Sequence, residues 1–198
     1  MLDIDFSPYP FSTGSNVITG AVNTGSGIPV KKISKVIGVV KAYTSRVGGG
    51  PIPTELTNDL ADQIREKGGE FGTTTGRPRR IGWLDLEAVK FAVEVSGITD
   101  IVITKIDILS GLKELKVCIG YKINGKSISY SSCGYQELFN LTPIFKTLPG
   151  WKEDIAGVRN FKDLPENCQH YIKFVEKFLE VPINIVSTGP AREEYISL

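Results

Sequence analysis

Apolar positions recur at helical spacing in four parts of the chain. A spacing of three or four residues places such positions on one face of a helix. It predicts helices over residues 32–46, from Leu56 to Ile64, over 86–96 and from Pro165 to Leu179. Asp85 is the expected N-cap of the third helix. A residue that stops helices follows each of the four in turn: Gly48, Gly68, Gly97 and Pro182.

Shorter apolar runs between these helices predict strands. Residues 101–104 and 183–186 are rich in β-branched side chains, which is typical of buried parallel strands. Residues 116–121 and 127–130 flank Asn124-Gly125, a dipeptide that favours the tight turn of a β-hairpin. Strands that alternate with helices predict an α/β fold.

The first 31 residues differ from the rest of the chain, because they are rich in Gly, Ser, Thr and Pro and show no helical periodicity. A loop of this length is uncommon in a compact domain and is often functional. We find no internal repeat and no interdomain linker, so residues 1–198 are expected to form one domain.

Composition places the chain among ordinary globular proteins. Hydrophobic residues make up 41% of it, and 23 basic against 22 acidic residues give a net charge of +1. This balance favours neither nucleic acid nor an acidic membrane as a partner. The three cysteines are widely spaced, and we find neither a signal peptide nor an apolar run of membrane length. We therefore expect a cytoplasmic protein.

The strongest local signal for binding lies directly after the strand at 101–104. Lys105, Ile106 and Asp107 follow it, and ligands of open α/β sheets gather at the carboxyl ends of strands. A carboxylate there can accept hydrogen bonds from N1–H and the 2-amino group of guanine, whereas adenine offers no such pair of donors. The alternative is a solvated loop, the more common fate of a short Lys-x-Asp motif without context.

A second turn supports the guanine interpretation. Ser187, Thr188 and Gly189 follow the strand at 183–186, and backbone N–H groups of such a turn can face the O6 atom of guanine. Two strand-end loops with complementary hydrogen-bonding roles are what guanine selection requires. The alternative is an ordinary turn without a ligand.

The most basic segment of the chain is also a candidate site. Its functional residues are Thr73, Thr74, Thr75, Gly76, Arg77, Arg79 and Arg80. Arginine binds carboxylate and phosphate through bidentate bonds, the hydroxyls add donors, and glycine lets a loop close over a ligand. A solvated basic loop is about equally compatible with these residues.

The only histidine, His170, is expected to be structural or exposed. We find no metal-ligand cluster and no Gly-x-x-x-x-Gly-Lys phosphate loop.

Six segments, taken in order, resemble adenylosuccinate synthetase, the GTP-dependent ligase that joins L-aspartate to IMP in purine biosynthesis. They are residues 2–5, 38–56, 70–85, 103–111, 148–151 and 187–190. The segment 70–85, EFGTTTGRPRRIGWLD, is the most specific of them. The resemblance implies the C-terminal part of that α/β fold, a mixed sheet with flanking helices and a β-hairpin.

The resemblance also implies roles for single residues. Those implied for IMP are Thr13, Val47 and Arg77. Those implied for aspartate are Thr73, Thr74, Thr75, Gly76 and Arg77. Those implied for GTP are Arg79, Lys105, Ile106, Asp107, Ser187, Thr188 and Gly189. Arg77 and Arg79 would also stabilise charge on the transferred phosphoryl group.

Two departures from the family limit what this chain is expected to do alone. Family members begin with a phosphate loop that carries a catalytic Asp, followed by a catalytic His, and that front segment also supplies magnesium contacts. None of this is found here, so the chain alone is expected to be inactive without a fused or separate N-terminal segment. Ser7-Pro8 also replaces the more usual Gly-Thr. The family's homodimer is a further expectation, and a noncatalytic module that binds guanine nucleotides or dimerises is the alternative.

Overall fold

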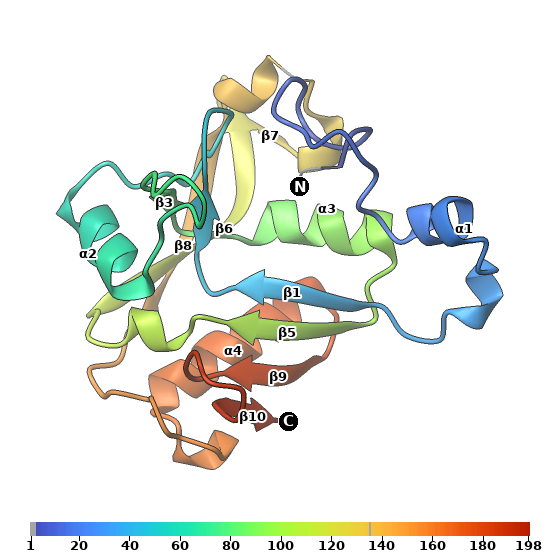
Figure 1. Ribbon diagram of the computed structural model, residues 1–198. Coiled ribbons are helices and arrows are strands. Elements are labelled where there is room, and N and C mark those ends of the chain that lie inside the picture. Colours follow the sequence, from blue (N-terminus) through green and yellow to red (C-terminus); the bar gives the residue numbers. More distant parts are fainter. Residues whose placement is uncertain (1–2, 135) are drawn as a thin grey trace.

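A four-stranded sheet organises the computed structural model, which describes residues 3–134 and 136–198. Its strands lie in the order β1 (Ile37–Lys41), β5 (Asp100–Thr104), β9 (Ile183–Ser187) and β10 (Tyr195–Ser197). β1, β5 and β9 are parallel, and β10 runs antiparallel to β9. The three parallel arrows point toward the side of the molecule where helix α2 (Asp59–Gly68) lies (Figure 1).

The predicted helices α2, α3 (Leu86–Ser96) and α4 (Glu166–Leu179) are confirmed. Asp85 caps α3 by accepting a hydrogen bond from Ala88 N, and Gly97 closes it in the left-handed conformation. Apolar side chains of α3 and α4 share one core with those of β5, and the two helices contact each other. In the described part of the chain, no helix has the length and apolar character needed to cross a membrane.

A second sheet contains the predicted hairpin. β6 (Glu114–Ile123) pairs with β7 (Lys126–Ile128), with β4 (Leu84–Asp85) and with β8 (Thr142–Pro149). Asn124 and Gly125 both have positive φ, as the tight hairpin turn requires. β8 and β10 were not predicted. The mixed sheets and flanking helices confirm the α/β fold.

The helix predicted over 32–46 is wrong. Strand β1 and strand β2 (Thr44–Arg46) occupy most of that range, and β2 pairs with β3 (Arg80–Gly82). The apolar positions are compatible with both periods, and pairing of the β-branched run with β5 favours the strand. The first 31 residues also contain an unpredicted short helix, α1 (Gly20–Ser26), which buries none of its residues.

Five short 3-10 helices complete the described elements. They are Val30–Lys32, Asp107–Leu109, Tyr130–Ser132, Glu137–Phe139 and Phe161–Asp163. Met1, Leu2 and Tyr135 lie outside the described residues, and Leu2 belongs to the motif at 2–5.

Strand β1 forms an edge of the first sheet among the described residues, and it carries apolar side chains into solvent. Ile37 is 56% exposed and Val39 is 70% exposed. An exposed apolar edge strand is a template for pairing with another chain. We therefore expect the isolated chain to self-associate through β1.

Replacing Val39 with lysine tests this expectation. Because Val39 contributes little to the core, Val39→Lys is expected to change the free energy of unfolding by less than about 0.5 kcal/mol. It should lower the fraction of oligomer seen by analytical ultracentrifugation, since charge on an edge strand opposes pairing. The matched variant is Tyr195→Lys, at an exposed position of β10 on the opposite edge. Equal oligomer fractions for wild type and Val39→Lys would contradict association through β1.

Candidate functional site

The loops predicted to bind ligands leave the sheet at one edge. Val40 of β1 is in register with Ile103 of β5, and Ile103 is in register with Val186 of β9. Because the three strands are parallel, the segments after Lys41, Thr104 and Ser187 begin next to one another. The structure therefore brings the Lys105–Asp107 and Ser187–Gly189 segments to neighbouring strand ends (Figure 1).

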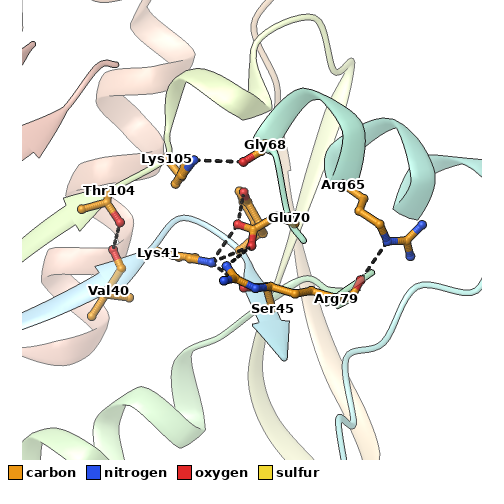
Figure 2. Close-up of polar contacts among 10 residues, drawn as sticks. Val40, Lys41, Ser45, Arg65, Gly68, Glu70, Arg79, Thr104 and Lys105 are labelled. Carbon is orange, nitrogen blue, oxygen red and sulfur yellow. Dashed lines mark hydrogen bonds and ion pairs between the residues drawn. The ribbon is translucent and has the colours of Figure 1, made fainter. Parts of the chain in front are cut away.

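Lys105 makes a sharp turn directly after β5. Its φ of 62° is rare for a residue with a side chain, and its Nζ atom donates to Gly68 O at the end of α2, at 2.9 Å. Figure 2 shows this bond beside a cluster of polar side chains around Glu70. Ile106 is fully buried and anchors the turn in the core. Asp107 then begins a 3-10 helix.

The environment of Asp107 disfavours its ionised form. Burial raises the pKa of this carboxyl, the charges of Lys105 and Lys67 lower it in part, and Asp154 raises it further. Lys67 Nζ also donates to the Asp107 backbone oxygen at 3.1 Å. A ligand that offers two N–H donors to the carboxylate would offset the lost hydration.

Hydrogen bonds of a buried side chain and within the turn itself fix the turn after β9. Thr188 is fully buried, and its hydroxyl donates to Val158 O at 3.1 Å and accepts from Arg159 Nη1 at 3.3 Å. Ser187 Oγ donates to Gly189 O at 2.9 Å. A Cβ on Gly189 would collide with the Glu194 carboxylate, so the Glu194 side chain would have to move to admit a larger residue at this position. Thr188 therefore supports the turn with its side chain, and its backbone N–H donates to Glu194 O at 2.9 Å.

The basic loop projects from the molecule as a closed turn. Gly72 N donates to Arg77 O at 2.8 Å, and Gly76 N donates to Gly72 O at 2.7 Å. Gly76 has a φ of 64°, which glycine adopts without strain. Residues 73–78 are exposed, whereas Arg79 is only partly exposed. The loop thus presents Arg77 to solvent while Arg79 turns back toward the sheet.

Arg79 belongs to a buried ionic cluster around Glu70 (Figure 2). The Glu70 carboxylate, 1% exposed, accepts from Arg79 Nη1 at 2.7 Å and from Lys41 Nζ at 2.7 and 2.9 Å. The Tyr43 hydroxyl donates to the same carboxylate at 2.7 Å. Burial opposes ionisation of Glu70, but these three donors outweigh it and lower its pKa to about 2. Glu70 is therefore a permanent anion at neutral pH.

Tyr43 connects this cluster with the turn that carries Asp107. Burial, the hydrogen bond to Glu70 and the charges of Glu70 and Asp107 together raise the pKa of Tyr43 far above its ordinary value. A Cβ on Gly68, the residue that accepts from Lys105, would lie 2.5 Å from the Tyr43 hydroxyl. The Arg79 cluster and the Lys105 turn therefore meet at the end of α2.

Thr13 and Val47 lie on loops that contact each other. Arg46 Nη2 donates to Phe11 O at 2.7 Å, and the guanidinium lies 5.8 Å from the centre of the Phe11 ring. Thr13 Oγ1 donates to Ser15 O at 3.1 Å. The first loop is thereby fixed beside the loop after β2, and both residues implied for IMP lie in this part of the molecule.

A cavity with a volume of about 700 Å³ lies between β1, β2 and α3. Lys41, Val47 and Arg79 are among its lining residues. Other residues implied for ligands line neither this cavity nor the smaller one near Tyr130: Thr13, Arg77, Lys105, Asp107 and the 187–189 turn. Only some of the candidate residues therefore share a cavity.

Sequence reasoning missed the residues that hold the candidate site together. Glu70, Lys41 and Tyr43 were given no role, although Glu70 begins the most specific segment. The available signal was a single acid directly before a loop with three arginines, which indicates an internal ion pair. Among the described residues, no group of His, Cys, Asp and Glu could hold a metal ion.

Comparisons with known proteins agree on one family. A family model described as adenylosuccinate synthetase matches residues 1–196. The adenylosuccinate synthetases of Halothermothrix orenii and Caldanaerobacter subterraneus subsp. tengcongensis are each 50% identical, over 99% and 100% of this chain. The match covers 46% of each relative. The chain therefore spans about half the length of the curated relatives that it matches.

Solved structures show the same similarity. The fully ligated adenylosuccinate synthetase of Plasmodium falciparum is 43% identical, with a TM-score of 0.95 over 100% of this chain and 47% of that one. Succinoaminodeoxyadenylate synthetase of cyanophage S-2L is 16% identical with a TM-score of 0.59, which indicates a shared fold only.

Proposed function

Because the chain belongs to the adenylosuccinate synthetase family, we propose that it forms the guanine-selecting and loop-closing part of a GTP-dependent ligase. The complete reaction joins L-aspartate to IMP. The γ-phosphoryl group of GTP moves to O6 of IMP, the aspartate amine attacks C6, and phosphate leaves. The products are adenylosuccinate, GDP and phosphate.

Guanine selection is the step that this chain's residues support best. Asp107 lies at the carboxyl end of β5, partly buried, with Lys105 beside it. Its carboxylate would accept from N1–H and the 2-amino group of guanine. The neighbouring 187–189 turn would face O6 with the backbone N–H of Gly189, since that of Thr188 donates to Glu194 O, and the stem of Lys105 would lie along the base. This juxtaposition of two strand-end turns is the observation that carries the proposal.

The basic loop would close over the other substrates. Thr73, Thr74 and Thr75 would donate hydroxyl hydrogen bonds to aspartate, and Arg77 would bind its carboxylate together with IMP. Arg79 would bind the phosphates of GTP and stabilise the transferred phosphoryl group. The exposure of 73–78 is compatible with a loop that moves onto its ligand. Thr13 and Val47 would contact the phosphate and ribose of IMP.

The acid and base of the reaction would come from the rest of the synthetase, since the chain matches only 46% of its relatives. In this proposal the remainder also supplies the protein contacts to Mg²⁺, as the resemblance to the family implies. It would be a fused or separate segment, and the assembled enzyme would be a cytoplasmic homodimer. The chain alone would bind nucleotide without turnover, which is also what a noncatalytic guanine-nucleotide module would do.

The substitution Asp107→Asn tests guanine selection. An amide offers one acceptor and one donor group, so it cannot accept both guanine hydrogen bonds. Loss of a charge-assisted pair of bonds is expected to weaken GTP binding about 10- to 100-fold and to leave ATP binding nearly unchanged. Calorimetry with both nucleotides on the isolated chain measures the ratio.

The matched control is Asp154→Asn, because Asp154 is the other carboxylate whose charge reaches this site and has no proposed contact with guanine. It should preserve the preference for GTP. An unchanged GTP to ATP ratio in Asp107→Asn would refute the proposed role of Asp107.

A complementation experiment separates the ligase from the noncatalytic module. The chain is mixed with the unmatched part of the Halothermothrix orenii synthetase, and adenylosuccinate formation is followed by absorbance. Activity that requires both pieces, and that Arg79→Met abolishes, would support the ligase. Tight GTP binding without any activity in the mixture would favour the module.

A further inference from the structure

The cluster around Glu70 contains two cationic side chains and one carboxylate, so it has one cation more than is required to neutralise the acid. Glu70 accepts from both Lys41 and Arg79, whose side chains are 29% and 28% exposed, whereas Glu70 is 1% exposed. A carboxylate paired with one arginine would cancel the charge of that arginine. With Lys41 present, one anion and two cations leave a net charge of +1 at the cavity wall.

Lys41 has little capacity left to contact a ligand itself. Its ammonium has three N–H groups, and it donates to both Glu70 oxygens and to Ser45 Oγ at 2.5 Å (Figure 2). It therefore acts on the charge of the cluster, and it holds both oxygens of the Glu70 carboxylate, one of which also accepts from Arg79. Lys41 supplies the positive charge that keeps Arg79 attractive to an anion.

Arg79 is held at both its backbone and its side chain. Its N–H donates to Glu70 O at 2.9 Å, and its carbonyl accepts from Arg65 Nε at 2.8 Å. Its Nη1 atom donates to the Glu70 carboxylate. Among the described residues its Nε and Nη2 atoms have no such acceptor, so two donors stay available at the cavity. A guanidinium fixed in this way loses little freedom when it binds a phosphate.

We infer that Glu70 is a positioning residue for phosphate binding: it orients Arg79 toward the cavity, and Lys41 offsets its charge so that the site keeps a net charge of +1. The inference rests on the proposed function, in which Arg79 contacts the phosphates of a nucleotide. It adds that Glu70 and Lys41, which have no proposed contact with the ligand, decide how tightly the phosphates bind.

Three variants separate orientation from charge. Glu70→Gln removes the anchor and raises the net charge of the cluster to +2. Lys41→Met keeps the anchor and lowers the net charge to zero. The double variant restores the wild-type net charge of +1 without the anchor. If charge alone decided affinity, the double variant would bind as wild type does and Glu70→Gln would bind more tightly.

Pyrophosphate is the probe, because it carries the phosphate chemistry without a base. The full chain is titrated with it while the Nε–H signal of Arg79 is followed by NMR at moderate salt. We expect the wild-type signal to shift, and Glu70→Gln and the double variant to bind about ten-fold more weakly. Lys41→Met should retain a sharp Arg79 signal and bind about three-fold more weakly, as loss of a partly exposed charge would predict.

The matched control is Glu55→Gln. Glu55 pairs with Arg80, the residue that follows Arg79, and the variant removes an equivalent carboxylate from an arginine. It should leave pyrophosphate affinity unchanged. Where Glu70→Gln does not fold, Glu70→Asp replaces it, because the charge is kept while the carboxylate retracts from Arg79. It is expected to weaken binding as well.

Two results would overturn the inference. One is an Arg79 signal in the wild type that does not respond to pyrophosphate. The other is a Glu70 variant that binds as tightly as wild type in its folded state. A failed Asp107→Asn experiment with an intact pyrophosphate response would instead refute guanine selection alone, because pyrophosphate does not use the Asp107 turn.

Discussion

Replacing Gly150 with alanine is expected to destabilise the chain by about 3 kcal/mol or more. A Cβ at this position would lie 2.8 Å from the Leu112 carbonyl carbon and closer still to its oxygen, with Lys113 C at 3.0 Å. These are backbone atoms, so no side chain can rotate away. The segment at 112–113 would have to move.

The displacement caused by this clash would also affect the proposed guanine site. Gly150 N donates to Lys113 O at 2.9 Å, and Trp151 O accepts from Gly111 N at 2.8 Å. The Trp151 indole also donates to Ser110 Oγ at 3.0 Å. These bonds fix the segment that follows the 3-10 helix at Asp107–Leu109. Gly150→Ala should therefore weaken GTP binding as well as stability, although Gly150 contacts no ligand in the proposed function.

Urea unfolding followed by tryptophan fluorescence measures the effect, because Trp151 is buried beside the substitution. A loss of about 3 kcal/mol corresponds to a melting temperature lower by roughly 6–12 °C in a chain of this size. Gly120→Ala is the matched control, since its Cβ would meet only Ile144 at 3.5 Å and is expected to cost less than about 1 kcal/mol. Equal stability of the two variants would show that the 112–113 segment moves aside without a loss in the free energy of unfolding.

Local sequence patterns predicted the elements whose capping or turn residues lie within a few positions of the element itself. The helix α3, with Asp85 before it and Gly97 after it, and the hairpin at Asn124-Gly125 have such signals, and both are confirmed. The same reasoning failed at 32–46. Spacing there fits a helix, and only the pairing partner β5, about 60 residues away, selects the strand. β8 escaped prediction because its exposed and partly exposed residues do not alternate regularly and its strand form depends on pairing with β6.

The candidate site was likewise predictable from the sequence only in part. Motifs identified Asp107, Arg77 and the 187–189 turn as candidates, and the parallel register of β5 and β9 brings the two turns together. Roles for these residues stay predictions. The contacts that orient them came from no motif. Glu70 and Lys41 are 29 residues apart, and a pairing at that separation cannot be read from a single sequence.

Acid is expected to remove about 3 kcal/mol of stability through Glu70 alone. The folded chain lowers the pKa of this carboxyl from 4.5 to about 2, so folding favours the ionised form. Such a group contributes its full stabilisation above the unfolded pKa, and the contribution disappears as the pH falls from about 4.5 to 2. A difference of this size between the two pKa values corresponds to about 3 kcal/mol.

The test is the difference in free energy of unfolding between wild type and Glu70→Gln, measured by urea unfolding at several pH values. Carboxylates elsewhere titrate in both proteins, so their contributions cancel in the difference. The difference should be constant above about pH 5 and should shrink by about 3 kcal/mol as the pH approaches 2. For Asp62→Asn, which removes a carboxylate that is 69% exposed, the corresponding change should be below about 1 kcal/mol. A difference independent of pH would mean that Lys41 and Arg79 do not hold Glu70 in its charged form, and the basis for its positioning role would be lost.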